Sequence, residues 1–392
     1  MNKKLGILLF VNAIILLLIA NQLSISFHES ELYFNSNSAL SYIVRAFTTL
    51  FGQNDIAIRL PMIIFHLLSV YLLYQISKPI LVNEKERIYT VAIFMMLPGV
   101  ISASLLLNPA GLVIFLTLLY LYERDRNEMF SYLILALMLF VDSAFAMLYL
   151  ALFIHALYEN RSHFAVIMLT FFVASMLIFG FDTGGKPKTY FLDTFAIYAA
   201  IFSPLLFIYM FYTLYRTLIK EKKSLLFFIA ASTLVFSFLL SFRQRIPIES
   251  FAPFLIISMP LVAQMFLRSY YIRLKEHRAF YRNSLSIIMA TLLFSSLVII
   301  FNPLWYYMIK NPDKHFARNH HIVKNLALEL KSIGIFNINV EDVRMRERLK
   351  FYGIGSKSEY SLSKYVKPNS KKVTIRYMGA EAGDYYIFKT LE

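Results

Sequence analysis

The sequence predicts an α-helical polytopic membrane protein with a small C-terminal α/β domain outside the membrane. The 392 residues are 58% hydrophobic and 16% charged, and their mean hydropathy is +0.59. Soluble globular domains carry about 45–50% apolar and about 25% charged residues. The composition therefore excludes an ordinary soluble enzyme, a disordered chain and a nucleic-acid-binding domain, although the net charge is +15. Cysteine is absent, which excludes disulfides, thiol nucleophiles and cysteine-ligated metals.

Uncharged or nearly uncharged stretches locate the predicted membrane spans, each of which takes about 20 apolar residues. The first stretch, 5–27, is longer than the apolar part of a typical signal peptide, so we expect a retained first span. Residues 88–122 would form a single helix about 52 Å long. Either Pro98 or Pro109 would break such a helix, so we expect two spans there. The stretches are 5–27, 60–77, 88–122, 129–158, 162–181, 194–215, 224–242, 250–267 and 283–309.

The distribution of basic residues decides whether Asp142 divides the stretch 129–158 into two spans. Splitting both long stretches gives 11 spans, with the N-terminus in the cytoplasm, 17 Lys and Arg in inside loops and 6 in outside loops. This bias is what the positive-inside rule expects. Splitting only one stretch would place the basic loops 216–223 and 268–282 outside, and keeping both whole requires the overlong helix. We therefore predict 11 spans within residues 1–302.

Residues 303–392 have a different composition and form the predicted outer domain. They contain 16 Lys or Arg and 9 Asp or Glu, and no apolar run of span length. The resulting net charge of +7 would suit an anionic glycan or lipid, and a stabilising lid is the alternative role. We expect His320 and His321 to lie in the first helix and to be solvated. Periodicity predicts helices at 319–333 and 344–352 and strands at 336–340, 372–377 and 385–389.

An acidic motif follows the first span directly, in the first outside loop. Two carboxylates and an imidazole at a membrane surface suit a general base or a metal site. The alternative is a solvated loop with Glu29 near a helix start. The segment 37–51 that follows has the apolar pattern of a helix lying in the membrane interface. The motif reads His28-Glu29-Ser30-Glu31-Leu32-Tyr33, and the apolar residues of the next helix are Leu40, Ile43, Val44 and Phe47.

A carboxylate pair above an interfacial helix resembles the GT-C type of polytopic glycosyltransferase, especially lipid A aminoarabinose transferases and protein O-mannosyltransferases. The likeness covers about residues 5–270 in order and topology, and it rests on an ordered set of short motifs. These are Glu29-Ser30-Glu31-Leu32-Tyr33, which approximates an Asp-Glu-x-x-Tyr loop, Leu50-Phe51-Gly52 through Arg59-Leu60-Pro61, Asn108-Pro109 before the fourth span, and the basic segment 241–253.

The resemblance implies a reaction and a set of site residues. The reaction is an inverting transfer of a sugar from a polyprenyl-phosphate donor to a lipid, glycan or protein acceptor, at the outer face of a bacterial plasma membrane. Either Glu29 or Glu31 would be the base, and Arg243 and Arg245 would hold the phosphate, unless they are topological or lipid-binding arginines. The remaining candidates for substrate contact are His28, Tyr33, Arg59, Asn108, Asp142, Lys186 and Lys188.

Two departures from the family pattern bear on activity and cofactors. Asn108 stands where an acidic residue is common, and an amide is a weaker cation ligand and cannot act as a base. We assign no cofactor. A divalent cation is the one candidate, and the altered acidic motif argues against it. Asp142 has an alternative role as the turn between two short helices. The alternative functions are an inactive scaffold in envelope glycan assembly and a transporter. A transporter would favour internal repeats, and the sequence shows none.

Overall fold

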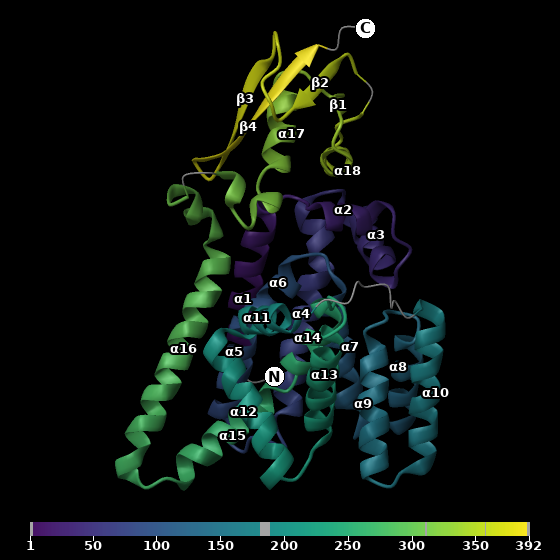
Figure 1. Ribbon diagram of the computed structural model, residues 1–392, viewed down its shortest axis with the longest axis vertical. Helices are drawn as coiled ribbons and strands as arrows, with labels where there is room; N and C mark the ends of the chain where they lie inside the picture. Colours follow the sequence, from purple (N-terminus) through teal and green to yellow (C-terminus); the bar gives the residue numbers. More distant parts are fainter. Residues whose placement is uncertain (1–2, 181–188, 310–311, 357, 390–392) are drawn as a thin grey trace. The chain divides into compact units, whose positions relative to one another are not determined.

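The computed structural model describes residues 3–180, 189–309, 312–356 and 358–389, most of which are helical (Figure 1). The chain divides into two compact units. The first contains the residues up to Ala13, Met62–Ser104 and Asn108–Ser296. The second contains Ile14–Pro61, Leu105–Leu107 and the chain from Leu297 onward. The second unit therefore combines the acidic motif with the C-terminal region.

The first unit consists of helices, four of which, α1, α4, α6 and α16, also contribute residues to the second unit. A short 3-10 helix, η1 (Lys275–His277), precedes α16. The α-helices are α1 (Lys3–Gln22), α4 (Asp55–Ile76), α5 (Glu84–Met96), α6 (Pro98–Leu105), α7 (Pro109–Arg124), α8 (Glu128–Met138), α9 (Phe145–Tyr158), α10 (Ser162–Phe179), α11 (Phe191–Phe202), α12 (Pro204–Lys220), α13 (Leu225–Ser241), α14 (Ile248–Ile256), α15 (Met259–Ile272) and α16 (Arg278–Ile300).

Several helices are long and apolar enough to cross a membrane. Among the described residues, 4 segments have the length and apolar composition of a membrane span, namely α1, α4, α10 and η1 with α16. The number rises to 7 when the bent pairs α5–α6, α11–α12 and α14–α15 each count as one span. This confirms a multi-pass helical protein. The larger number of 11 spans, which also uses the shorter helices, stays a prediction.

The predicted breaks in the two long apolar stretches are confirmed. The helices α5 and α6 meet at an angle of 65° before Pro98, and α8 and α9 are separate helices on either side of Asp142. The predicted span over 194–215 contains a break that was not foreseen, because α11 and α12 meet at 105°. The cause is local: Ser203 has a positive φ of 76°, and Pro204 starts the next helix.

The core of the first unit lies where α7, α9, α13 and α14 pack against one another. Tyr149 of α9 is buried there, and its hydroxyl donates to the carbonyl of Leu135 at 2.8 Å. Helix α10 packs on α9 (Figure 1) but buries only Ala165, Met168 and Ser175. Most of its apolar surface therefore faces outward, as expected of a helix that contacts lipid.

The second unit contains the expected C-terminal sheet and two helices. The strand order is β1-β2-β4-β3, with β1 parallel to β2 and the other pairs antiparallel, in a register that places Leu362 opposite Ile387. Strand β2 was not predicted, because its four residues are too few to show alternation. The elements are α2 (Phe27–Phe34), α3 (Ala39–Phe51), η2 (Asn302–Tyr307), η3 (Pro312–Lys314), η4 (Arg318–His320), α17 (Val323–Ser332), β1 (Asn339–Val340), α18 (Val343–Phe351), β2 (Tyr360–Ser363), β3 (Lys371–Tyr377) and β4 (Ala380–Lys389).

One face of the sheet is covered by α17 (Figure 1). The helix is amphipathic, and its residues Val323, Leu326 and Leu330 are buried in one cluster with Ile375 and Tyr385 of the sheet. The boundary of a separate domain at residue 303 stays a prediction. The sheet and its helix share their compact unit with α2 and α3.

The predicted amphipathic helix over 37–51 is present as α3. Its buried face carries Leu40 and Val44, together with Ser41 and Thr48. Arg45 holds the turn before it, because its guanidinium donates to the carbonyls of Tyr33, Phe34 and Ser36. This fixes the path of the chain between α2 and α3.

Candidate functional site

The acidic motif forms the short helix α2, which begins with a capping box. Ser26 Oγ accepts the N–H of Glu29 at 3.3 Å, and Glu29 Oε2 accepts the N–H of Ser26 at 2.7 Å. The spacing Ser-x-x-Glu is the sequence signal for this arrangement. The cap turns the Glu29 side chain back toward the start of the helix.

Glu29 forms a buried ion pair with Arg59 of α4. Arg59 Nη2 lies 3.3 Å from Glu29 Oε2, and the two side chains are 0% and 2% exposed. The other carboxylate oxygen accepts the N–H of Leu107 at 3.0 Å. Both oxygens of Glu29 are therefore occupied by donors from the protein itself.

The rest of the Arg59 guanidinium binds carbonyl oxygens at the end of α1. Nη1 donates to the carbonyl of Leu23 at 2.9 Å, and Nη2 donates to that of Ser24 at 3.1 Å. The orphan carbonyls at a helix C-terminus favour a cation. Nη1 also lies 3.6 Å from Asp55 Oδ1, one turn earlier in α4. Arg59 thus joins the end of α1, helix α2 and the start of α4.

Asp55 connects this cluster to the C-terminal region. Lys324 Nζ of α17 lies 2.9 Å from Asp55 Oδ2, and the Tyr352 hydroxyl donates to Oδ1 at 2.6 Å. The same hydroxyl accepts the N–H of Ile25 at 2.9 Å, and Arg348 Nε donates to the carbonyl of Ile25 at 3.1 Å. Side chains of the C-terminal helices therefore hold the segment between α1 and α2 as well as Asp55. We call Glu29, Asp55, Arg59, Lys324 and Tyr352 the buried charge network.

Replacing Tyr352 with phenylalanine tests this connection. The substitution leaves the Ile25 N–H and an Asp55 oxygen without their partner, and such a loss at a buried site costs about 1–3 kcal/mol. We expect a lower thermal midpoint for the purified protein in detergent. Tyr365→Phe, which removes a hydroxyl from an exposed side chain, should leave the midpoint unchanged. Equal midpoints for the two variants would contradict the assigned role of Tyr352.

The prediction that His320 and His321 are solvated was wrong. Both precede α17 rather than lying in it, because the chain forms the 3-10 turn η4 there. His320 Nδ1 lies 3.6 Å from Glu29 Oε2, and the His320 carbonyl accepts the N–H of Ser24 at 2.8 Å. The His321 ring stacks on Tyr377 with a centroid distance of 4.1 Å. Burial lowers the pKa of both imidazoles, so both are neutral near pH 7.

The electrostatics of Glu29 favour its charged form. Burial alone would raise the pKa of this carboxyl, yet Arg59 and the N–H groups of Leu107 and Ser26 lower it below 4.5. The carboxylate therefore stabilises the fold above about pH 4.5, and this contribution is lost as the pH falls through the lowered pKa. A base with a lowered pKa and both oxygens occupied accepts a proton poorly.

His321 makes the stability of the second unit sensitive to mild acid. Its pKa is lowered to about 3 in the fold from an ordinary 6.5, so the unfolded chain takes up the proton first. Folding should lose about 1.2 kcal/mol through this group between pH 7 and pH 5.5. His321→Phe should reduce the fall of the thermal midpoint over this range, whereas His163→Phe, at an exposed position, should not. An unchanged pH dependence in His321→Phe would contradict the assignment.

The other residues of the motif face different surroundings. His28 and Glu31 are exposed on α2. The Tyr33 hydroxyl shares a hydrogen bond with Thr48 Oγ1 at 3.1 Å, and its ring meets Phe351 edge-on. The structure therefore brings Glu29 and Arg59 together and leaves Glu31 as the carboxylate of the motif that is open to solvent.

Four more predicted site residues belong to the first unit. Asn108 caps α7, since its Oδ1 accepts the N–H of Ala110 at 3.0 Å. Asp142 shapes the turn before α9 by accepting the N–H of Ala144 at 2.8 Å. Arg243 and Arg245 are exposed just after α13. Lys186 and Lys188 lie outside the described residues.

The sequence reasoning missed most of the buried charge network. Asp55 was detectable, because it precedes Arg59 by four residues at a helix start, and the capping box pointed to an inward Glu29. Lys324 and Tyr352 gave no signal, because they lie 269 or more residues from Asp55 in the chain. No group of three or more His, Asp or Glu side chains in the described part of the chain is arranged to hold a metal ion.

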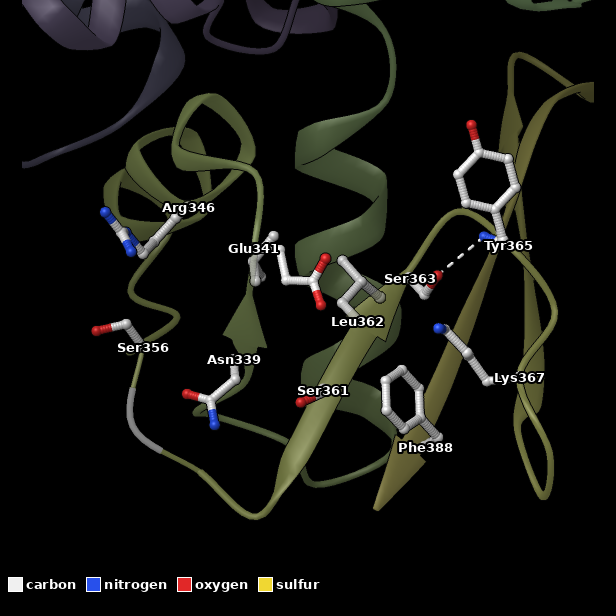
Figure 2. A pocket seen from close by; sticks show the side chains of 11 residues that line it. Asn339, Glu341, Arg346, Ser356, Ser361, Leu362, Ser363, Tyr365, Lys367 and Phe388 are labelled. Atoms are coloured by element: carbon white, nitrogen blue, oxygen red, sulfur yellow. Dashed lines mark hydrogen bonds between the residues drawn. The ribbon is translucent and has the colours of Figure 1, made fainter. Parts of the chain in front are cut away.

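A separate polar hollow of about 260 Å³ lies in the C-terminal region. Figure 2 shows Arg346 and Lys367 on opposite sides of it, with the Glu341 carboxylate between them. Val340, Leu362 and Phe388 form its apolar part. Hydroxyl and amide groups also line it, and such a set can hydrogen-bond a hydroxyl-rich ligand. They belong to Asn339, Ser356, Ser361, Ser363 and Tyr365.

Several helices long and apolar enough to cross a membrane define the class of a polytopic membrane protein. Within this class, residues 37–181 match the family model of the dolichyl-phosphate-mannose-protein mannosyltransferases. The match confirms the resemblance to GT-C type glycosyltransferases over these residues. Arg59, Asn108 and Asp142 lie inside the matched range, whereas Glu29 and Glu31 precede it. No protein of curated function matches the chain.

Proposed function

We propose that this chain is a GT-C type membrane glycosyltransferase that uses a polyprenyl-phosphate sugar donor at the outer face of a bacterial plasma membrane. The match over residues 37–181 is the observation that carries the class of reaction. The acidic helix α2, directly after the first apolar helix, supports a site at the membrane surface. The N-terminus would be cytoplasmic and the C-terminal region extracytoplasmic.

The proposed reaction is a single inverting displacement. The acceptor hydroxyl oxygen forms a bond to the anomeric carbon of the sugar, while the bond from that carbon to the phosphate oxygen breaks. The polyprenyl phosphate leaves with the bonding electrons, and a carboxylate of the enzyme takes the hydroxyl proton. Cationic side chains near the phosphate stabilise the leaving group.

The exposed Glu31 is the better candidate for the base. Its side chain is open to solvent, so an acceptor hydroxyl can reach it. Glu29 is the alternative, and it could accept a proton only after Arg59 had moved away from it. In the proposal, Glu29 and Arg59 act as positioning residues that hold α2 in place.

Exposed basic residues would bind the donor phosphate. Arg243 and Arg245 follow α13, and no ion pair engages either guanidinium within the described ranges. Both are therefore available to a phosphate, which arginine can bind through two parallel hydrogen bonds. Lys186 and Lys188 remain part of this proposal as a second basic segment. The polar hollow beside Arg346 would contact the acceptor, for which its hydrogen-bonding groups are suited.

Incorporation of labelled sugar tests the proposal. The purified full chain, reconstituted in vesicles, should transfer label from a polyprenyl-phosphate sugar to extracted envelope lipid or glycan. Arg243→Ala with Arg245→Ala should reduce the transfer, because the phosphate loses its cations, whereas Lys314→Ala should not. If the full chain neither binds nor turns over any polyprenyl-phosphate donor, the proposal is wrong.

A reporter fused after Glu392 tests the orientation separately. A reporter that is active only outside the cytoplasm should give signal there. A cytoplasmic signal would contradict the predicted placement of α2 and of the C-terminal region.

An inactive scaffold is the second candidate function. The observation in its favour is that Glu29 is neutralised by Arg59 and that Asn108 serves as a helix cap. Such a protein would bind the donor and release it unchanged. Binding without transfer, in the presence of extracted acceptor, would favour this candidate over the enzyme.

A further inference from the structure

An apolar hollow of about 300 Å³ lies within the first unit, between α5, α12, α15 and α16. Its walls are almost entirely aliphatic or aromatic, and Glu86 is the one charged residue in the lining. Each helix contributes apolar side chains to the lining, such as Ile93 of α5, Leu206 of α12, Phe266 of α15 and Met289 of α16.

The hollow exists because α16 packs loosely on its neighbours. Only Leu292 and Ser296 of this 23-residue helix are buried. Leu285, Ile288 and Met289 lie on one helical face, are only partly buried and line the hollow. Apolar walls without neighbouring atoms lose dispersion contacts, and water gains nothing by entering such a space. In a bilayer, a hydrocarbon chain is the molecule that fills it.

One end of the hollow is strongly basic. Residues 268–282 carry 5 Lys or Arg and a single Glu. Tyr271 joins this segment to the lining, because its hydroxyl donates to Glu86 Oε1 at 3.2 Å. The Tyr271 carbonyl in turn accepts from Arg278 Nη2 at 3.2 Å, and the Arg273 carbonyl accepts from Arg278 Nε at 3.0 Å.

The charges of Arg273 and Arg278 are not neutralised by carboxylates. Arg278 binds neutral carbonyls and stacks over Tyr270, and Arg273 stacks over Tyr281. Arg268, by contrast, is paired with Glu221 at 2.8 Å. Among the described residues, no ion pair involves Arg273 or Arg278. An anion at this end of the hollow would meet two guanidinium groups whose charge no described carboxylate neutralises.

We propose that this hollow is a binding site for an anionic phospholipid. One acyl chain lies between α16 and the walls formed by α5, α12 and α15, and the phosphate lies against Arg273 and Arg278. The positive-inside rule assigns this basic segment to the cytoplasmic face, so the lipid belongs to the inner leaflet. This site is separate from the acidic motif and does not depend on the proposed transferase activity.

Retention of bound lipid after extraction tests this proposal directly. The full chain is reconstituted in nanodiscs of phosphatidylcholine and phosphatidylglycerol, extracted in mild detergent and analysed by native mass spectrometry. We expect one phosphatidylglycerol to remain bound in preference to phosphatidylcholine. Arg273→Gln with Arg278→Gln should weaken this binding about twenty-fivefold, at about fivefold for each arginine near an anionic headgroup. Lys220→Gln with Lys222→Gln removes the same charge from an exposed segment and should change little.

Filling the hollow with a larger side chain provides the second test of the lipid site. Ala263→Trp and, independently, Met289→Trp place an indole where the acyl chain would lie, and each should abolish retention. Val173→Trp on the exposed surface of α10 is the matched control. A tryptophan variant is informative only if its thermal midpoint stays near that of the parent protein. Two positions are used so that, if one variant misfolds, the other still tests the proposal. Equal retention of the two phospholipids, unchanged retention in both tryptophan variants, or displacement by a polyprenyl phosphate would overturn the proposal.

Discussion

Replacing Arg59 with methionine is expected to lower the free energy of unfolding by about 3–5 kcal/mol, the typical cost of removing one partner of a buried ion pair. Methionine matches the length of the arginine stem but supplies no charge. Glu29 and Asp55 would then be two buried carboxylates 26 residues apart in the chain, with Lys324 as their remaining close cation. The carbonyls of Leu23 and Ser24 would lose their donors as well. The thermal midpoint and the yield of monodisperse protein measure the effect.

A compensating variant separates electrostatics from shape. Arg59→Met combined with Glu29→Gln and Asp55→Asn removes the uncompensated charges and should recover part of the lost stability. Arg243→Met, at an exposed position, should leave the midpoint nearly unchanged. If Arg59→Met is as stable as the parent protein, or if the triple variant is less stable than the single one, the buried charge network does not stabilise the fold as we describe.

The predicted helix breaks were accurate where the sequence contains strong local signals. Pro98, Asp142 and Pro109 each interrupt a helix, as their chemistry predicts. The sharp bend at Ser203 was missed, because a serine before a proline within an apolar run is also compatible with a continuous span. The bend depends on a positive φ at Ser203, which tertiary packing selects and composition does not reveal.

The candidate site was predictable only in part. The motif kept Glu29 and Glu31 as alternative bases, and the structure buries Glu29 and exposes Glu31. The burial of Arg59 was not predictable, because an arginine at a helix start more often lies in the membrane interface. His320 and Tyr352 join the site through contacts between segments about 300 residues apart, such as that of Tyr352 with Ile25. Long-range contacts of this kind leave no pattern in a single sequence.

The buried charge network gives the C-terminal region a structural role that composition alone did not indicate. Tyr352 and Arg348 of α18 hold Ile25, and Lys324 of α17 holds Asp55 and the carbonyl of Asn21. These contacts set the position of the segment that leads into α2. Within this unit, the C-terminal helices therefore position the acidic motif, whatever acceptor the polar hollow contacts.

Glu31→Gln is expected to reduce sugar transfer by about 10²–10⁴-fold, the range for loss of a general base, without changing the thermal midpoint. The side chain is exposed, and the amide has nearly the same size, so the fold has little to lose. Glu29→Gln should behave differently. Its amide N–H₂ would face the N–H of Ser26 or Leu107 or the Arg59 guanidinium, so one donor would point at another. We expect a lower midpoint together with lower activity. Initial rates of label transfer, normalised to folded protein, separate the two effects.

Two further variants make this assignment refutable. Glu128→Gln, an exposed glutamate at the start of α8, controls for the loss of a surface charge and should retain full transfer. Glu31→Asp keeps the carboxylate on a shorter stem and should retain part of the activity that Glu31→Gln loses. If Glu31→Gln transfers sugar at the parental rate, while Glu29→Asp remains folded and inactive, then Glu29 is the base. In that case Arg59 must release the Glu29 carboxylate during the reaction, because both of its oxygens are occupied in this structure.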